Sequence, residues 1–238
     1  MDAAAHNNQI LRRLRSVRKR MSAAALKTRR DAAEIKLVAV SKTHPPDLIQ
    51  EAIAAGVTDL GENRVQEADS KIPKVGRKAA RWHLIGHLQS NKARRVIQLF
   101  DVIHSLDSAA LARRLERMCA EEKREELPVL IQVDLGREET KTGISENEIP
   151  ALVKTLNDCG RLKLIGLMTL PPYFEEAERA RPFFRRLREL RDQLASQRAF
   201  GSGPGELSMG MTHDFEIAIE EGATVVRVGT AIFGARAD

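Results

Sequence analysis

A lysine closes one of the most apolar runs of the chain. Lys42 follows the run Leu37–Val40 with only Ser41 between them, in the stretch IKLVAVSKTH. Apolar surroundings disfavour the ammonium form of lysine, so burial favours the neutral amine. A neutral amine is a nucleophile toward an aldehyde or a ketone. The position of Lys42 therefore predicts a lysine that forms a Schiff base. The alternative is a lysine whose amine extends from the strand end into solvent.

Two segments near the C-terminus hold residue types that suit an anionic ligand. Ser208 lies in ELSMGM, and Arg227, Gly229 and Thr230 lie in VVRVGTAIFG. Arg227 is flanked by apolar residues, so its permanent charge needs a buried acceptor, either an internal Asp or Glu or a ligand. The bare backbone at Gly229 and the hydroxyls of Ser208 and Thr230 favour a phosphate group.

The elements that must position these residues alternate along the chain. Helical stretches with apolar residues three and four apart separate eight strand-like runs. The runs are 35–42, 58–63, 81–86, 102–107, 128–136, 162–170, 206–211 and 225–234. Eight such units predict a single (β/α)8 TIM barrel, in one domain spanning residues 1–238. An open doubly wound parallel sheet is the alternative fold.

The first helical segment is basic and amphipathic. Residues 1–30 have a net charge of +8, although the whole chain has only +6. The same segment has Ile10, Leu14, Val17 and Met21 at helical spacing. We expect this helix to close the helical ring over the strand that would otherwise lack one, with its charges in solvent. A basic nucleic-acid module would need basic residues along one face together with stacking aromatics, and aromatics are only 4% of the chain.

In a barrel of this kind the C-terminal strand ends meet at one face. Lys42 would lie there together with Ser208, Gly229 and Thr230, and Arg227 would lie in or beside the barrel. A Schiff-base lysine, a phosphate site and a buried cation together suit an aldehyde-bearing, phosphorylated, heteroaromatic cofactor. Pyridoxal 5′-phosphate (PLP) has all three properties.

Several motifs, taken in order, resemble one family. They are LVAVSKTHP, DLGENRVQEADSKI, WHLIGHLQSNK, LIQVDLGREETKTGI, LIGLMTL, ELSMGMTHDFEIAI and ATVVRVGTAIFGAR. Residues 10–236 thereby resemble the pyridoxal phosphate homeostasis proteins, single-domain relatives of the alanine racemase barrel.

The resemblance implies a fold-type III PLP-binding barrel and assigns a role to each site residue. It implies Lys42 as the lysine bound to the cofactor, Arg227 facing the pyridine nitrogen, and phosphate contacts from Ser208, Gly229 and Thr230. Asn63 matches the asparagine of the GEN motif, near the cofactor. Arg64 stands where many members have tyrosine, and Thr212-His213 replaces a serine-containing pair.

The resemblance implies a protein of vitamin B6 metabolism that binds, buffers or delivers the cofactor rather than an enzyme. PLP-dependent apoenzymes are the expected recipients. An amino-acid racemase is the alternative, but it needs a base on each face of the substrate. Lys42 can serve one face, whereas the chain ends soon after the last strand and its one tyrosine is Tyr173. We therefore expect no catalytic residues.

The remaining composition points to a soluble, cytoplasmic protein without a bound metal. We expect a monomer, with a weak dimer as the alternative. Cys119 and Cys159 have no ligand-like spacing and predict reduced thiols. His83 and His87 are four apart, but the strand-like WHLIG predicts that they point apart as core or rim histidines. No apolar run approaches the roughly 18 residues of a membrane span, so we expect no membrane partner.

Overall fold

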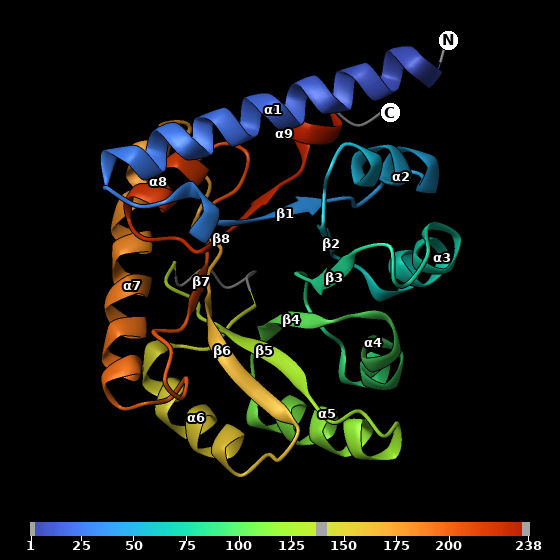
Figure 1. Cartoon of the computed structure of the whole chain (residues 1–238). Coiled ribbons are helices and arrows are strands. Elements are labelled where there is room, and N and C mark those ends of the chain that lie inside the picture. The colour runs from blue at the N-terminus through green and yellow to red at the C-terminus, as the bar shows by residue number, and fades with distance from the viewer. Residues whose placement is uncertain (1–2, 137–141, 235–238) are drawn as a thin grey trace.

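Eight parallel strands close into a barrel in the order in which they occur in the chain. The structure, a computed structural model, describes residues 3–136 and 142–234, with side chains from residue 9 onward. Figure 1 shows the barrel with its surrounding helices. The strands are β1 (Lys36–Val40), β2 (Asp59–Glu62), β3 (Arg81–Leu84), β4 (Val102–Leu106), β5 (Leu127–Gln132), β6 (Leu162–Met168), β7 (Glu206–Ser208) and β8 (Val225–Val228). The predicted TIM barrel is confirmed, and the open sheet is excluded because β1 pairs with β8.

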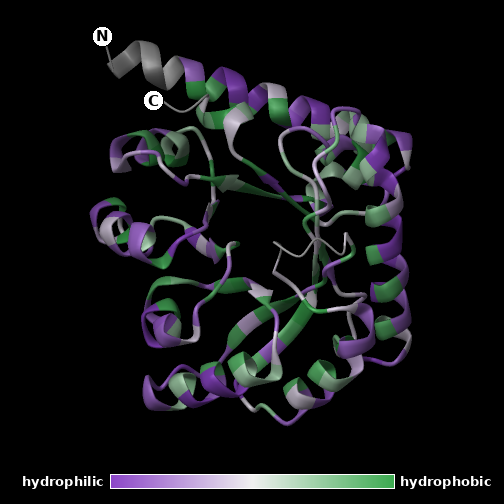
Figure 2. Ribbon diagram, turned by 180° about the vertical axis from the view of Figure 1, so that it is seen from behind, coloured by the Kyte–Doolittle hydropathy of each residue, from purple (hydrophilic) through white to green (hydrophobic). Residues whose placement is uncertain are grey.

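Helices cover the outside of the barrel. They are α1 (Ala3–Lys27), α2 (Pro46–Ala54), α3 (Val65–Val75), α4 (Ala93–Leu99), α5 (Ala109–Glu121), α6 (Ile149–Asn157), α7 (Arg181–Ser196), α8 (Phe215–Glu220) and α9 (Thr230–Phe233). Their apolar faces turn toward the strands and their polar faces outward, as Figure 2 shows.

Alternate strand residues point to opposite sides of the sheet, as the period of a strand requires. Leu60, Trp82, Ile103 and similar residues pack in the large apolar core, to which the helices also contribute. The intervening positions point into the barrel. They form a small apolar cluster of Val102, Leu130 and Met168, together with buried polar side chains that include His83, His104, Ser208 and Arg227.

The N-terminal helix closes the helical ring, as predicted. Ile10, Leu14, Val17 and Met21 are all buried in the main core. Two ion pairs join α1 to the neighbouring helix α8. Arg20 of α1 pairs with Glu216 at 2.5 Å, and Lys27 of α1 pairs with Glu220 at 2.7 Å. Figure 1 shows α1 lying across α8 and α9, at the seam where the last strand meets the first.

The strands are shorter at their C-terminal ends than the sequence predicts. The run 225–234 is a strand only to Val228, and residues 230–233 form α9. The run 35–42 is a strand only to Val40, so Lys42 lies in the turn that follows. In the run 225–234, the apolar residues Ile232 and Phe233 continue beyond the strand because α9 is also buried against the core. The predictive pattern therefore overestimates strand length.

Candidate functional site

Lys42 is half-buried in the turn after β1, and the residues on either side of it are held in place. The amide of Ser41 donates to the carbonyl of Gly61 at 3.0 Å. Thr43 has a φ of +67°, a left-handed conformation that few residues adopt, and its amide donates to the Glu67 carboxylate. His44 stacks on Phe233 of α9, with ring centroids 4.9 Å apart. The backbone that bears Lys42 is therefore fixed from both sides.

A buried lysine of α3 connects these anchors. Lys71 Nζ donates to the Ser41 carbonyl at 2.9 Å, to Glu62 Oε1 at 3.2 Å and to Glu67 Oε1 at 2.5 Å. Glu62 is fully buried and also accepts from Ser41 Oγ at 2.7 Å. Burial raises the pKa of Glu62, and the charge of Lys71 opposes that rise. We call Ser41, Glu62, Glu67 and Lys71 the β1 clamp.

Arg227 points into the barrel and is 3% exposed. Its Nη1 donates to Ser208 Oγ at 2.6 Å and its Nη2 to the Thr169 carbonyl at 2.9 Å. No Asp or Glu in the described ranges forms an ion pair with it, so the internal carboxylate partner considered from the sequence is not found there. Burial lowers the pKa of Arg227 to about 10, which leaves the guanidinium charged at neutral pH.

A chain of hydrogen bonds extends from Arg227 across the barrel. Ser208 Oγ lies 2.8 Å from His104 Nδ1, and His104 Nε2 lies 2.8 Å from His83 Nδ1. His83 Nε2 lies 2.9 Å from Asp59 Oδ1 on β2. We call these five residues, Asp59, His83, His104, Ser208 and Arg227, the interior relay.

The chemistry of its two ends gives the interior relay one direction. The pKa values of both histidines are lowered, primarily by burial, so each histidine has a single N–H at neutral pH. Hydrogen bonds from His83 and Thr58 hold the pKa of Asp59 low, so Asp59 is a carboxylate that only accepts. His83 must then donate from Nε2, which leaves its Nδ1 to accept from His104 Nε2. The Ser208 hydroxyl proton is thereby directed to His104.

The predicted phosphate residues lie at the C-terminal ends of β7 and β8. Gly229 follows β8 directly, and its amide donates to Thr212 Oγ1 at 3.3 Å. A methyl group at Gly229 would lie 3.2 Å from the Val40 carbonyl oxygen, so Gly229 allows β8 to approach the end of β1. Thr230 is exposed and begins α9. Ser208, by contrast, is fully buried beside Arg227.

Asn63 follows β2 at the same face of the barrel and is half-buried. A methyl group at Gly86 would lie 2.3 Å from the Asn63 carbonyl oxygen, so the loops after β2 and β3 touch through their backbones. This contact fixes the backbone of Asn63. The structure thus brings Lys42, Asn63, Gly229 and Thr230 to one end of the barrel, with Arg227 inside it.

The interior relay and the β1 clamp do not follow from the sequence pattern. That pattern predicts His83 only as a core or rim histidine, which its 1% exposure confirms, and it predicts no role for His104 or Asp59. One signal was available, because polar residues at alternate positions of otherwise apolar strands point into the barrel. For Lys71, an ordinary position in a helical pattern gave no such signal.

Two absences hold within the described residues. In residues 3–136 and 142–234, no three His, Cys, Asp or Glu side chains gather in a way that could hold a metal ion. Within the same ranges, no helix has the length and apolar character needed to cross a bilayer.

Comparisons with known proteins agree on one family. The family model for the N-terminal domain of alanine racemase matches residues 3–237. A pyridoxal phosphate homeostasis protein of Aquifex aeolicus is 43% identical over 224 residues, covering 94% of this chain and 97% of the relative. Its Escherichia coli K12 namesake is 42% identical over 235 residues, covering 96% and 97%.

Solved structures show the same fold. PipY of Synechococcus elongatus, solved with PLP bound, has a TM-score of 0.82 and 38% identity, covering 95% of this chain and 100% of PipY. Alanine racemase of Corynebacterium glutamicum has a TM-score of 0.67 and 18% identity, covering 98% of this chain and 62% of the racemase. The racemase similarity therefore extends to the fold alone.

Proposed function

We propose, from the premise that this chain belongs to the alanine racemase N-terminal domain family and to its pyridoxal phosphate homeostasis members, that it binds PLP and maintains its supply. The single observation that best supports this role is the placement of Lys42. It lies in a fixed turn at the same barrel end as the backbone of Gly229 and Thr230. PLP-dependent apoenzymes are the proposed recipients, and a monomer is the proposed acting form.

The residues present fit the cofactor. Lys42 would hold the aldehyde carbon of PLP, and Gly229 and Thr230 would hold its phosphate. Asn63 would lie near the cofactor. Thr212, whose hydroxyl oxygen accepts from the Gly229 amide, would join the phosphate site. Arg227 would face the ring nitrogen with Ser208 behind it, and the assignment of Ser208 to the phosphate stays a prediction. When bound, PLP supplies an aldehyde that condenses with amines and a ring that withdraws electrons.

The protein's own residues favour holding the cofactor over turnover. Arg227 is a permanent donor, so it presents a proton to a ring nitrogen without giving that proton up. The single tyrosine of the chain, Tyr173, is 78% exposed and lies 5.6 Å from the ring of His213. A side chain this exposed is a poor second base, because racemisation needs a base held rigidly on the face opposite Lys42.

An isotope experiment distinguishes a carrier from a racemase. The PLP-loaded protein is incubated with several L-amino acids in deuterated water, and deuterium incorporation and chirality are both followed. A carrier retains the L configuration with little exchange. Racemisation at about 1 per second or faster, abolished by Lys42→Ala, would establish an enzyme instead.

A further inference from the structure

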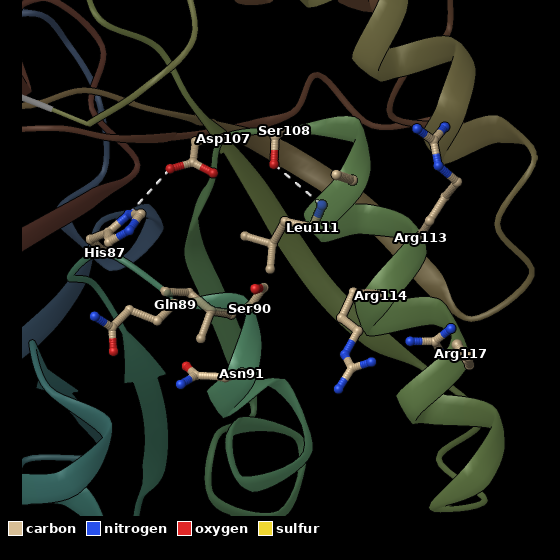
Figure 3. Close-up of a pocket in the computed structure, with 12 residues that line it drawn as sticks. His87, Gln89, Ser90, Asn91, Asp107, Ser108, Leu111, Arg113, Arg114 and Arg117 are labelled. Atoms are coloured by element: carbon tan, nitrogen blue, oxygen red, sulfur yellow. Dashed lines mark hydrogen bonds and ion pairs between the residues drawn. The ribbon is translucent and has the colours of Figure 1, made fainter.

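A cavity of about 970 Å³ lies beside the barrel mouth, outside the proposed PLP site. It opens between the loop that follows β3 and helix α5, as Figure 3 shows. His87 and Asp107, which follow β3 and β4, line it, with His87 Nδ1 3.3 Å from Asp107 Oδ2. The loop belongs to the motif WHLIGHLQSNK, most of which the proposed PLP site does not use.

One wall of this cavity is cationic. Arg113, Arg114 and Arg117 line it from α5. Within the ranges described above, no carboxylate forms an ion pair with Arg113 or Arg114, and the contact of Arg117 with Glu121 is a loose one at 4.0 Å. Arg94 of α4 pairs with both Glu121 and Glu122, so these two acids are already partly neutralised.

The opposite wall offers hydrogen-bonding groups. Gln89, Ser90 and Asn91 are exposed and line the cavity from the β3–α4 loop. In Figure 3, Arg114 of α5 lies across the cavity from Gln89 and Asn91 of the loop. Buried Leu88 and Leu111 also line the cavity and give it an apolar base.

We propose that this cavity binds a small organic anion with a phosphate chain, of the class of nucleoside diphosphates. Uncompensated guanidinium groups bind phosphate in a fork geometry that lysine cannot offer. The side-chain amides opposite them can donate to and accept from the polar edge of a planar group lying on the apolar base. The volume falls within the range of small-molecule sites. None of the residues that line this cavity belongs to the proposed PLP site.

The test uses the full chain and three probes: ADP, inorganic pyrophosphate and adenosine. Calorimetry at low salt should show binding of ADP and pyrophosphate and much weaker binding of adenosine. Arg114→Gln combined with Arg117→Gln should weaken ADP binding by about tenfold or more, since two charge-assisted contacts are lost. The matched control is Arg15→Gln with Lys19→Gln, which removes the same charge from the exposed face of α1 and should leave the affinity nearly unchanged.

Nuclear magnetic resonance places the probe. In ¹⁵N-labelled protein, ADP should shift the side-chain amide signals of Gln89 and Asn91. Three results would overturn the proposal: no binding of any phosphate probe at millimolar concentration, an equal loss in both double variants, or shifts confined to the backbone amides of Gly229 and Thr230. The last result would place the anion at the proposed PLP phosphate site.

Discussion

His83 Nδ1 accepts a hydrogen bond from His104 Nε2, 2.8 Å away inside the barrel. Two neutral histidines form such a bond only when one donates and the other accepts. The carboxylate of Asp59 determines which one donates, because it takes the only N–H of His83. The interior relay thus runs in one direction, from the guanidinium of Arg227 to the carboxylate of Asp59.

The first prediction concerns the tautomers in the interior relay. At pH 7.5, both His83 and His104 should carry their proton on Nε2. The ¹⁵N chemical shifts of the ring nitrogens measure this directly, with each histidine assigned from its own substitution by glutamine. Asp59→Asn can both donate and accept, so it should allow the opposite tautomer of His83 and broaden or shift its signals. A proton on Nδ1 of either ring in the unsubstituted protein would contradict the assigned direction.

The second prediction is a loss of stability in mild acid. Burial lowers the pKa values of His83 and His104 below the ordinary 6.5. Below pH 6.5 the unfolded chain therefore binds more protons than the folded one, and the free energy of unfolding decreases. At pH 5.5 each histidine accounts for a loss of up to about 1.4 kcal/mol.

Urea unfolding at pH 7.0 and 5.5 measures this loss. Burial raises the pKa values of Glu62, Asp107 and Asp214, so these carboxyls oppose the loss as the pH falls and reduce its size. Proton signals of the two histidine rings, followed over the same range, separate the contributions. Ring signals that titrate near 6.5 would show that burial does not lower these pKa values.

The third prediction assigns the covalent attachment to Lys42. Borohydride treatment of PLP-loaded protein should fix a pyridoxyl group on the peptide that contains Lys42, and mass spectrometry of the digest identifies it. Lys42→Arg keeps the charge but lacks the nucleophilic amine, so it should lose the label. Lys36→Arg is the matched control, because Lys36 begins β1, whereas Lys42 follows its C-terminal end, and Lys36 pairs with Glu206. A label on another lysine, with Lys42 unmodified, would refute the assignment.

The fourth prediction concerns the phosphate. Thr230→Val and Thr212→Val should each weaken PLP retention, because each removes a hydroxyl worth on the order of 1 kcal/mol, or roughly fivefold in affinity. Thr155→Val is the control, because its hydroxyl donates to the Ala151 carbonyl within α6. Ser208→Ala tests the predicted phosphate contact of Ser208 in the same assay. Weaker retention would support that contact, whereas a change in the absorption spectrum of bound PLP alone would assign Ser208 to the support of Arg227. Unchanged retention in both threonine variants would place the phosphate elsewhere.

The fifth prediction tests the β1 clamp. Lys71→Met leaves the buried carboxylate of Glu62 without its cation, so the free energy of unfolding should decrease by about 3–5 kcal/mol. Adding Glu62→Gln should recover much of the lost free energy of unfolding, because the buried, uncompensated charge is then removed. Slower labelling of Lys42 in the double variant, at restored stability, would show that the clamp positions Lys42. Equal labelling rates would limit the clamp to stability.

The barrel could be predicted from the sequence because it depends on local patterns that repeat. Runs such as Leu37–Val40 and the stripe of Ile10, Leu14 and Val17 have the period of one element each. The placement of Lys42 at the barrel mouth follows from the same repetition. The interior relay could not be predicted, because its contacts join five strands whose register sets which residues meet. Ser208 and His104, for instance, are 104 positions apart.

The seam between β1 and β8 has a consequence for synthesis on the ribosome. Lys36 pairs with Val225, so the first strand is made long before its last partner. Helix α1 is in the same position, because Arg20 and Lys27 bind residues of α8. Until that helix emerges, the stripe of Ile10, Leu14, Val17 and Met21 lacks part of its cover. The ring of helices therefore closes only after α8 has been synthesised, and the N-terminal helix finds its full set of partners last.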